Sequence, residues 1–298
     1  MTNDTIYMRL NFLAPIFAKM PKTIMALRYR HLTKWKLNLK DPQLFNEKII
    51  WLSFNTDTTE WTTASDKYAV RDYVINKWGS DDILNEIYGV YERAEDIDFD
   101  ALPQSFVLKT NNACTTNIIV HDKTKLDVHG AIRQLNRWLK HRYGDMTSQP
   151  HYSRIKPLII AEKLLVQDKN DPTKGLIDYK FNCFEGKVHS CVTMGDRTTN
   201  SHRTSKMHYD LQWNPHPEMY DEEPYNERFS YPGYVDKPQS LDKMIEIASV
   251  LCKGFKYVRV DLYEIEGKPV FGELSFLPGF DYYRSLKIQR MLGDLIKL

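Results

Sequence analysis

Two acidic residues near the C-terminus have the types and the spacing of ligands for a divalent cation. Asp261 lies in Val-Arg-Val-Asp-Leu-Tyr (258–263), and Glu273 lies in Phe-Gly-Glu-Leu-Ser-Phe-Leu-Pro-Gly (271–279). Both segments alternate apolar and polar residues, as half-buried strands do. The glycine-containing stretch 264–269 predicts a hairpin turn between them, which would hold the two carboxylates about 5 Å apart on neighbouring strands.

Mg²⁺ suits such a pair, because it usually takes one or two carboxylates and leaves its other positions to water and phosphate. The pattern therefore predicts a site for a nucleoside triphosphate. The alternative is an ordinary surface hairpin with two solvated acids.

Two further candidates lie on predicted strands. Lys109 ends the strand 105–109 and precedes the polar loop 111–117, where the cation and the loop amides could bind a phosphate. A solvated lysine is the alternative. Glu162 lies in the apolar strand 158–165, where a buried carboxylate needs a partner. That partner is either an adenosine amine or hydroxyl, or a nearby Lys or Arg.

Two basic residues share strand faces with acids. Lys180 alternates with apolar neighbours and lies on the same face as Asp178. Arg259 precedes Asp261 by two residues and projects from the same face. A guanidinium beside metal-binding carboxylates can brace them or stabilise developing negative charge.

The elements that must position these residues follow from periodicity and turn signals. Apolar and basic residues at helical spacing in 7–30, interrupted by prolines, fit a packing helix, which we favour, or a surface-binding amphipathic segment. The segment 195–238 is polar and rich in Pro, Tyr and His, and predicts a long loop of the kind that covers a site. The other predictions are helices at 45–52, 66–78, 127–142, 240–252 and the C-terminus, strands at 83–91 and 117–120, and a hairpin of 175–184 with 187–194.

Composition excludes several classes of protein. The 298 residues suffice for one large domain or two modest ones, and Lys plus Arg (41) nearly balances Asp plus Glu (39), so nucleic acid is not expected as a partner. The cysteines form no CxxC pair, which argues against a zinc site or a disulfide framework and favours a reducing cytosol. We expect neither a signal peptide nor a transmembrane segment, because no run approaches the roughly 20 apolar residues of a membrane span.

Other residues are weaker candidates. The histidines in or near the predicted loop, His189, His202, His208 and His216, match no standard metal-ligand spacing, so we interpret them as scattered surface residues. Trp213 and Tyr220 fit core packing best and are otherwise candidates for contact with carbohydrate.

The order of these motifs resembles the ATP-grasp superfamily, which includes D-alanine–D-alanine ligase and carboxylate–amine ligases. The chain is most similar to the teichuronopeptide-biosynthesis (TupA-like) ATP-grasp family of bacterial surface-polysaccharide clusters, over roughly residues 35–298. The strings that carry the resemblance are Phe45-Asn46-Glu47-Lys48-Ile49, Ser65-Asp66-Lys67-Tyr68-Ala69-Val70-Arg71, Tyr88-Gly89-Val90-Tyr91, Asp98-Phe99-Asp100, Leu102-Pro103, Phe106-Val107-Leu108-Lys109, Ile159-Ile160-Ala161-Glu162, Asp178-Tyr179-Lys180-Phe181, Asp196-Arg197 and the two C-terminal segments.

The resemblance implies a role for each matching residue. The phosphates of ATP would contact Lys67 and Lys109, with Thr115 in the phosphate loop, and Lys180 would lie near the phosphates or the adenine. The adenosine would be held by Glu162 and the backbone of Lys163 to Leu165. Mg²⁺ would be bound by Asp261, Glu273 and Ser275. Arg259 would face the transferred phosphoryl group or the acyl intermediate, and Asp196 and Arg197 would help to form the acceptor site.

The sequence departs from the family pattern at two places. The loop after Lys109 lacks the usual glycines, which allow backbone amides to approach a phosphate closely. The hydroxyls of Thr115 and Thr116 could partly substitute. Ser275 stands where many ATP-grasp enzymes have Asn, and its shorter side chain would reach a second metal only through water.

The resemblance also implies the fold and the reaction. We expect an α+β ATP-grasp fold with a helical N-terminal region (1–100), a small subdomain (101–165) and a large subdomain with the metal site (166–298), the two subdomains clasping ATP. The implied activity is an ATP-dependent carboxylate–amine ligase of capsule or surface-polysaccharide biosynthesis, which joins a uronic acid carboxylate to an amino acid or small amine through an acyl phosphate. The cytosol, including the inner face of the membrane, is the expected location. A sugar kinase, a glycosyltransferase and an inactive nucleotide-binding homologue stay open as alternatives.

Overall fold

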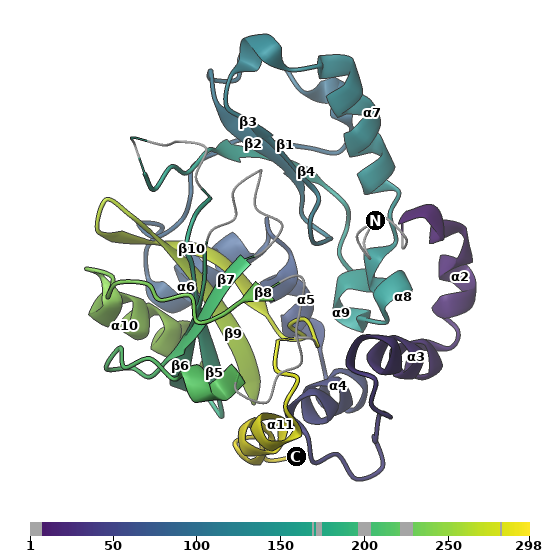
Figure 1. Ribbon diagram of the computed structural model, residues 1–298. Helices are drawn as coiled ribbons and strands as arrows, with labels where there is room; N and C mark the ends of the chain where they lie inside the picture. Colours follow the sequence, from purple (N-terminus) through teal and green to yellow (C-terminus); the bar gives the residue numbers. More distant parts are fainter. Residues whose placement is uncertain (1–7, 169, 171–174, 196–203, 221–228, 281) are drawn as a thin grey trace. The chain divides into compact units, whose positions relative to one another are not determined.

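The computed structural model describes residues 8–168, 170, 175–195, 204–220, 229–280 and 282–298 (Figure 1). The chain divides into two compact units, each assembled from separate parts of the sequence. Unit 1 comprises Met1–Arg28, Thr56–Tyr73 and Asn85–Leu164, and unit 2 comprises Tyr29–Asn55, Val74–Leu84 and Leu165–Leu298. Helices and two sheets occur together, so the predicted α+β class is confirmed. The division into 1–100, 101–165 and 166–298 stays a prediction.

Unit 1 is built on a four-stranded antiparallel sheet in the order β1-β4-β2-β3 (Figure 1). Phe106 and Leu108 of β2 point to a core that they share with Leu135 of α7. Strand residues alternate between faces, so Lys109 points the other way. The elements are β1 (Ile87–Tyr91), β2 (Phe106–Thr110), β3 (Asn117–Val120), β4 (Ile159–Lys163) and α7 (Val128–Leu139).

Shorter helices complete unit 1, and two helices have residues in both units. The prolines at 15 and 21 lie in the first turns of α2 and α3, where the missing amide N–H has no helical partner to lose. These elements are η1 (Asn11–Leu13), α2 (Ala14–Phe17), α5 (Thr59–Ser65), η2 (Ala94–Asp96), η3 (Lys123–Lys125), α8 (Tyr143–Thr147) and α9 (Pro150–Ser153), with α3 (Pro21–Thr33) and α6 (Val70–Trp78) divided between the units.

Unit 2 is built on a six-stranded sheet in the order β10-β9-β5-β6-β7-β8 (Figure 1). Its neighbours are antiparallel except for the parallel pair β7 and β8. The helix α10 packs on β5, β6 and β9, while α4 packs on α11. The elements are β5 (Asp178–Phe184), β6 (Lys187–Gly195), β7 (Thr204–Tyr209), β8 (Phe229–Ser230), β9 (Tyr257–Ile265), β10 (Lys268–Ser275), α4 (Phe45–Asn55), α10 (Leu241–Leu251), α11 (Leu286–Asp294) and η4 (Pro217–Tyr220).

Two tight hairpins organise the unit 2 sheet. Glu185 and Gly186 join β5 to β6, and Glu266 and Gly267 join β9 to β10. All four residues have positive φ, between 48° and 73°. Two-residue turns of this kind match the right-handed twist of the paired strands, and glycine adopts the conformation without strain. Both predicted hairpins are therefore confirmed.

The predicted loop 195–238 is wrong where regular elements form, although 231–238 contains neither helix nor strand, as predicted. Thr204–Tyr209 forms β7 inside the sheet, and a 3₁₀ helix and a short strand follow before residue 231. The sequence Thr-Ser-Lys-Met-His-Tyr hid this strand, because it buries Ser205, Lys206 and His208 where a strand pattern would show apolar residues. The other elements are found close to their predicted positions, although α6 begins at Val70 rather than at 66 and β1 begins at Ile87.

Candidate functional site

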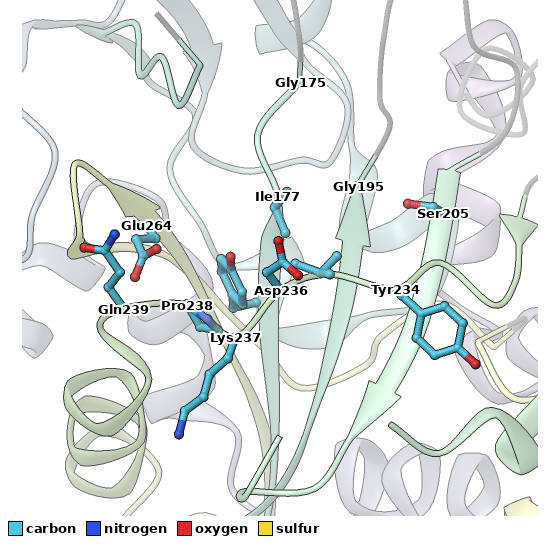
Figure 2. A pocket seen from close by; sticks show the side chains of 12 residues that line it. Gly175, Ile177, Gly195, Ser205, Tyr234, Asp236, Lys237, Pro238, Gln239 and Glu264 are labelled. Atoms are coloured by element: carbon cyan, nitrogen blue, oxygen red, sulfur yellow. The ribbon is translucent and has the colours of Figure 1, made fainter. Parts of the chain in front are cut away.

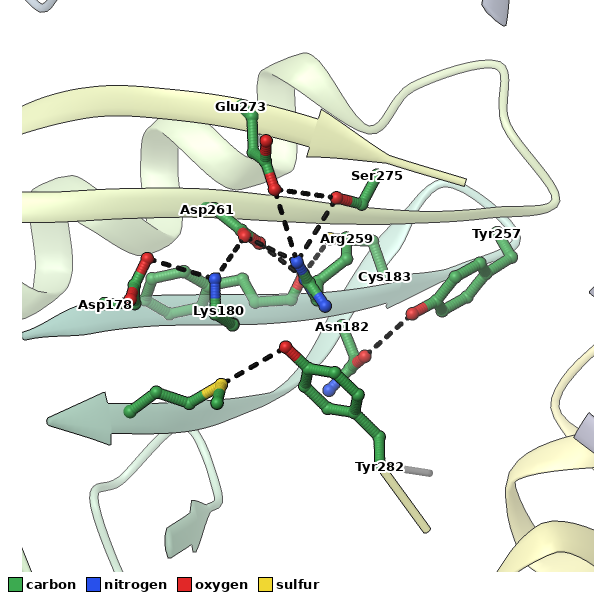
Figure 3. A network of polar contacts seen from close by, with 12 residues as sticks. Asp178, Lys180, Asn182, Cys183, Tyr257, Arg259, Asp261, Glu273, Ser275 and Tyr282 are labelled. Atoms are coloured by element: carbon green, nitrogen blue, oxygen red, sulfur yellow. Dashed lines mark hydrogen bonds and ion pairs between the residues drawn. The ribbon is translucent and has the colours of Figure 1, made fainter. Parts of the chain in front are cut away.

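The predicted metal ligands lie opposite each other on β9 and β10. Asp261 pairs directly with Glu273, and on its other side with Lys180 of β5. Arg259 pairs in the same way with Ser275. Directly paired residues present their side chains on the same face of a sheet, so the side chains predicted for the metal site gather on one face of unit 2 (Figure 3).

A β-bulge brings Glu273 to this face. From the turn onward, β10 pairs residue by residue until Phe271 meets Leu262, and the next pair is Glu273 with Asp261, which leaves Gly272 as the extra residue. Without the bulge, Glu273 would point to the opposite face, because a one-residue slip reverses every side chain. A Cβ on Gly272 would lie 3.0 Å from the carbonyl oxygen of Asp261. The tight contact explains why glycine suits the bulge.

Asp261 is the centre of a buried ion network (Figure 3). Arg259 donates to both of its carboxylate oxygens, from Nε and Nη2, at 2.6 Å each. The Nζ of Lys180 donates to Asp261 Oδ2 at 2.5 Å and to Asp178 Oδ1 at 3.0 Å. All four side chains are almost completely buried. Charges withdrawn from water in this way need mutual pairing.

The pairing decides the protonation states. Burial alone would raise the pKa of Asp261, but Arg259 and Lys180 hold it below its ordinary value. Burial would lower the pKa of Lys180. The nearby carboxylates of Asp178 and Asp261 outweigh this effect of burial and raise the pKa to about 12. The pKa of Arg259 is likewise raised, by Asp261 and to a lesser extent by Glu273, against the effect of burial. Asp261, Lys180 and Arg259 are therefore charged at neutral pH.

Glu273 is the accessible member of the group. Its side chain is 37% exposed, and its Oε1 lies 3.6 Å from Arg259 Nη2. The hydroxyl of Ser275 donates to Glu273 Oε1 at 3.2 Å and accepts from Arg259 Nη2 at 3.2 Å. The serine therefore holds the carboxylate beside the guanidinium while leaving it open to solvent.

The donors fit one Mg²⁺. Two carboxylates and a hydroxyl are hard oxygen ligands of the kind that Mg²⁺ prefers. Within the described ranges, no group of three or more His, Cys, Asp and Glu side chains is arranged to hold a metal ion. A two-carboxylate site whose remaining ligands are water and phosphate suits Mg²⁺ better than a closed protein cage would.

Unit 1 pairs two of its predicted nucleotide-binding residues with each other. The Nζ of Lys109 donates to Glu162 Oε1 at 2.6 Å, and both side chains are partly exposed. Val107 pairs with Glu162 across β2 and β4, so all three residues share the sheet face opposite α7. The partner of the Glu162 carboxylate is thus a lysine in this structure, one of the two possibilities raised by the sequence.

The loop after Lys109 is held from within unit 1. The Nζ of Lys67 donates to the carbonyl oxygen of Ala113. Thr115 has a left-handed backbone with φ of 58°, and its hydroxyl donates to the carbonyl of Cys114 at 2.7 Å. The predicted phosphate loop therefore makes a left-handed turn without glycine, and Lys67 lies against it.

The remaining predicted site residues divide into three groups. Lys163 ends β4 with an exposed side chain, and Leu165 follows it by two residues. Asp196 and Arg197 lie outside the described residues, as does His202. Trp213 and Tyr220 are buried, and Trp213 stacks on Tyr209 at 4.2 Å between ring centroids, so both pack within unit 2. The prediction of a surface position is wrong for His208, which is buried.

Lys206 is not among the site residues predicted from the sequence, because the sequence predicts a loop where its strand, β7, forms. The direct pairs Asp178–Met194 and Met194–Lys206 place it on the face that carries Asp261. The Nζ of Lys206 donates to the carbonyl of Tyr282 at 2.7 Å and lies 4.4 Å from the ring centroid of Tyr220. The Tyr282 ring in turn lies 5.1 Å from the guanidinium of Arg259. The signal in the sequence that could have identified Lys206 is the change from polar Lys206 to apolar Met207, which is typical of a strand.

A pocket of about 390 Å³ opens on the opposite side of the unit 2 sheet (Figure 2). Tyr179 and Glu264 line it, and their positions alternate with those of Lys180 and Asp261, so they point to the other face. None of the predicted site residues lines this pocket. It is therefore separate from the ion network.

Comparisons with known proteins identify the family. No curated protein matches the chain significantly. Among solved structures, the chain is similar to D-alanine–D-alanine ligase from Bacillus anthracis complexed with ATP (14% identity, TM-score 0.45, 78% of this chain and 65% of that one). It is also similar to L-amino acid ligase from Bacillus licheniformis (14%, 0.49, 85% and 55%) and to the ATP-grasp ligase PsnB complexed with minimal precursor, Mg and ADP (11%, 0.36, 79% and 59%).

This chain therefore spans less than two thirds of each of these proteins. At such TM-scores the structural likenesses carry no weight, and the assignment depends on the family match. The model of the TupA-like ATP-grasp family matches residues 47–297, which is most of the sequence. The chain belongs to the TupA-like ATP-grasp family.

Proposed function

We propose that this protein is an ATP-dependent ligase that joins a carboxylate to an amine. Membership in the ATP-grasp family supports the use of ATP and the ligase class. The observation that carries the proposal is the row Lys180–Asp261–Glu273, which holds a buried acid and an accessible acid side by side. Such a pair suits Mg²⁺ bound to a triphosphate.

The proposed chemistry has two steps. An oxygen of the substrate carboxylate attacks the γ-phosphorus of ATP, the bond between that phosphorus and the β–γ bridging oxygen breaks, and ADP and an acyl phosphate form. The amine nitrogen then attacks the acyl carbon, the carbon–oxygen bond to phosphate breaks, and the amide, phosphate and a proton are released. No protein nucleophile is required, so the protein acts by positioning reactants and neutralising charge.

Unit 2 would supply the metal ligands. Asp261 and Glu273 would bind Mg²⁺, and Ser275 would contact it through water. When bound, Mg²⁺ would neutralise the negative charge that develops on the phosphate oxygens. Arg259 and Lys180 hold the carboxylate of Asp261 in place. Arg259 also offers its guanidinium to the transferred phosphoryl group.

Unit 1 would bind the nucleotide. Lys109 and Lys67 would contact phosphate oxygens, with the hydroxyl of Thr115 as a further donor. Glu162 would accept from the adenosine, with the backbone from Lys163 to Leu165 beside it. The ion pair of Lys109 with Glu162 supports this assignment, because it keeps both side chains extended on one sheet face until the nucleotide replaces each partner.

Lys206 extends the proposal beyond the residues predicted from the sequence. It is a buried cation on the face of the metal ligands, and it donates to the carbonyl of Tyr282. A lysine on this face can donate to a phosphate oxygen in a charge-assisted hydrogen bond. We assign Lys206 to the triphosphate.

The substrates follow from the resemblance to surface-polysaccharide biosynthesis. We propose the carboxylate of a uronic acid, in a polysaccharide or its nucleotide-sugar precursor, and an amino acid or small amine. Arg197 and Asp196 would contribute to the acceptor site. A reaction that consumes ATP is expected in the cytosol.

The test is an ADP-release screen of uronic acids crossed with amines, in the presence of Mg·ATP. We expect ADP only when a carboxylate and an amine are both present. Glu273→Gln should reduce the rate about 100-fold or more, because it removes a charged ligand from the metal. Lys206→Gln should lower kcat/KM for ATP in the same assay.

Glu246→Gln is the matched control, because Glu246 is an accessible acid on α10 that pairs only with Lys243 in the described network. Its rate should equal that of the wild type. ADP release with a sugar hydroxyl and no carboxylate would make the protein a kinase. Equal rates for Glu273→Gln and Glu246→Gln would remove the metal assignment.

A further inference from the structure

The first helical segment of the chain is strongly basic. Residues 8–40 contain eight Lys and Arg residues and no Asp or Glu, although the whole chain is nearly neutral, with a formal charge of +2. A run of one sign within a balanced chain concentrates positive potential on one part of the surface. The residues of unit 1 in this run, 8–28, are called here the N-terminal basic segment.

The inner side of the N-terminal basic segment is fixed to unit 1. Asn11 donates through Nδ2 to the carbonyl of Lys140 at 2.9 Å and accepts through Oδ1 from the backbone of Arg142 at 2.9 Å. Ala14 is fully buried, and α2 packs on α8. Arg28 donates to the carbonyl of Thr147 at 3.3 Å. The segment is thus a docked part of the fold with a defined outer side.

The outer side is apolar. Phe12 is 72% exposed, Ile16 56%, Met20 47% and Leu27 61%. Phe12 lies in η1, Ile16 in α2, Met20 directly before α3 and Leu27 in α3. Four of the exposed large apolar residues of the described chain therefore lie within the N-terminal basic segment.

Basic side chains lie among these apolar residues. Arg9, Lys19 and Lys22 are all exposed. Exposed apolar side chains together with Lys and Arg on short helices are typical of a segment that lies in the interface of a bilayer. The apolar side chains enter the headgroup region, and the basic ones pair with anionic lipid headgroups.

We propose that the N-terminal basic segment docks the protein on an anionic membrane surface. Charge complementarity favours an anionic membrane over other partners of this surface. A second copy of the chain would present the same positive charge and would repel it, while a nucleic acid would use the basic residues but leave Phe12 and Ile16 in water. The described helices include none long and apolar enough to cross a membrane.

The test is vesicle flotation of the full chain, with phosphatidylcholine vesicles that contain 30% phosphatidylserine. Lys19→Gln/Lys22→Gln should weaken binding about 25-fold, from roughly fivefold for each basic residue near an anionic surface. Phe12→Ser/Ile16→Ser should weaken it about 100-fold, because two large side chains lose their apolar environment. Raising the salt to 0.5 M should also release the protein.

Two matched controls test whether binding depends on the N-terminal basic segment itself or on exposed aromatic and basic residues in general. Tyr234→Ser removes an aromatic side chain that is 64% exposed in unit 2, and Lys125→Gln/Arg133→Gln removes two exposed basic residues elsewhere in unit 1. Both should bind like the wild type. ADP release in solution should be unchanged in Phe12→Ser/Ile16→Ser, which separates docking from catalysis.

Three outcomes would overturn the proposal. The first is equal binding to vesicles without phosphatidylserine. The second is a Phe12→Ser/Ile16→Ser variant that floats like the wild type. The third is absence of vesicle binding together with self-association or RNA binding that depends on the same residues, which would assign the surface to that partner instead.

Discussion

Asp261→Ala is expected to destabilise the protein by about 3–5 kcal/mol and to abolish ADP release. The substitution leaves Arg259 and Lys180 buried without their shared carboxylate, and an uncompensated buried charge costs this much. Glu273→Gln should instead cost less than about 1 kcal/mol, because its side chain is 37% exposed. Substitutions of the two proposed ligands of one metal would thus have different effects on stability and similar effects on activity. Denaturant unfolding and the ADP assay measure the two effects separately.

The pH dependence of the stability of Asp261→Ala is a second test of the same network. The pKa of Asp261 is lowered in the folded protein, so its stabilising effect is complete above the unfolded value, near 4. It is lost as pH falls through the lower folded value. The stability difference between wild type and variant should therefore be constant from pH 7 to 5 and shrink only below about pH 4. An Asp261→Ala variant as stable as the control Glu246→Gln at neutral pH would contradict the buried network.

Acid should destabilise the protein through two buried histidines. Burial lowers the pKa of His151, in unit 1, to about 3, and burial with its basic neighbours does the same for His208, in unit 2. The unfolded chain takes up these protons near pH 6.5, so stability is intact above that pH and falls between about 6.5 and 3. Each histidine contributes a slope of up to about 1.4 kcal/mol per pH unit. Over this window the loss is large compared with the whole stability of a typical domain.

His151→Gln and His208→Gln test this expectation by urea unfolding from pH 7 to 4. Each substitution should reduce the slope of the free energy of unfolding against pH by the contribution of about one proton. This reduction does not depend on how the substitution changes stability at pH 7. His129→Gln, at an exposed position, is the control and should leave the curve unchanged. A wild-type curve that is flat from pH 6.5 to 4 would refute the assignment of both residues.

Local sequence signals were sufficient for the hairpins. The positive-φ turns at Glu185-Gly186 and Glu266-Gly267 are specified by adjacent residues, and alternation in β9 identified Arg259 and Asp261 as one face. The pairing of Asp261 with Glu273 was predicted, but its physical cause was not. It depends on the bulge at Gly272, and a bulge has no reliable signature in a single sequence.

Features that depend on tertiary partners could not be predicted. β7 buries Lys206 and His208 because an aromatic cluster and the Tyr282 carbonyl receive them, and its sequence alone reads as polar loop. The choice of Lys109 as the partner of Glu162 required the register of β2 against β4. The family resemblance supplied roles that composition and periodicity could not, and these roles stay predictions until variants are measured.

Calorimetric titration with a non-hydrolysable ATP analogue tests the central claim most directly. The wild type should bind the analogue at least about tenfold more tightly with Mg²⁺ than with EDTA, because in the proposed site the metal would link the phosphates to Asp261 and Glu273. Glu273→Gln should keep its fold and lose most of this difference. A wild-type affinity that is the same with Mg²⁺ and with EDTA, or a Glu273→Gln variant with an undiminished Mg²⁺ effect, would contradict the account.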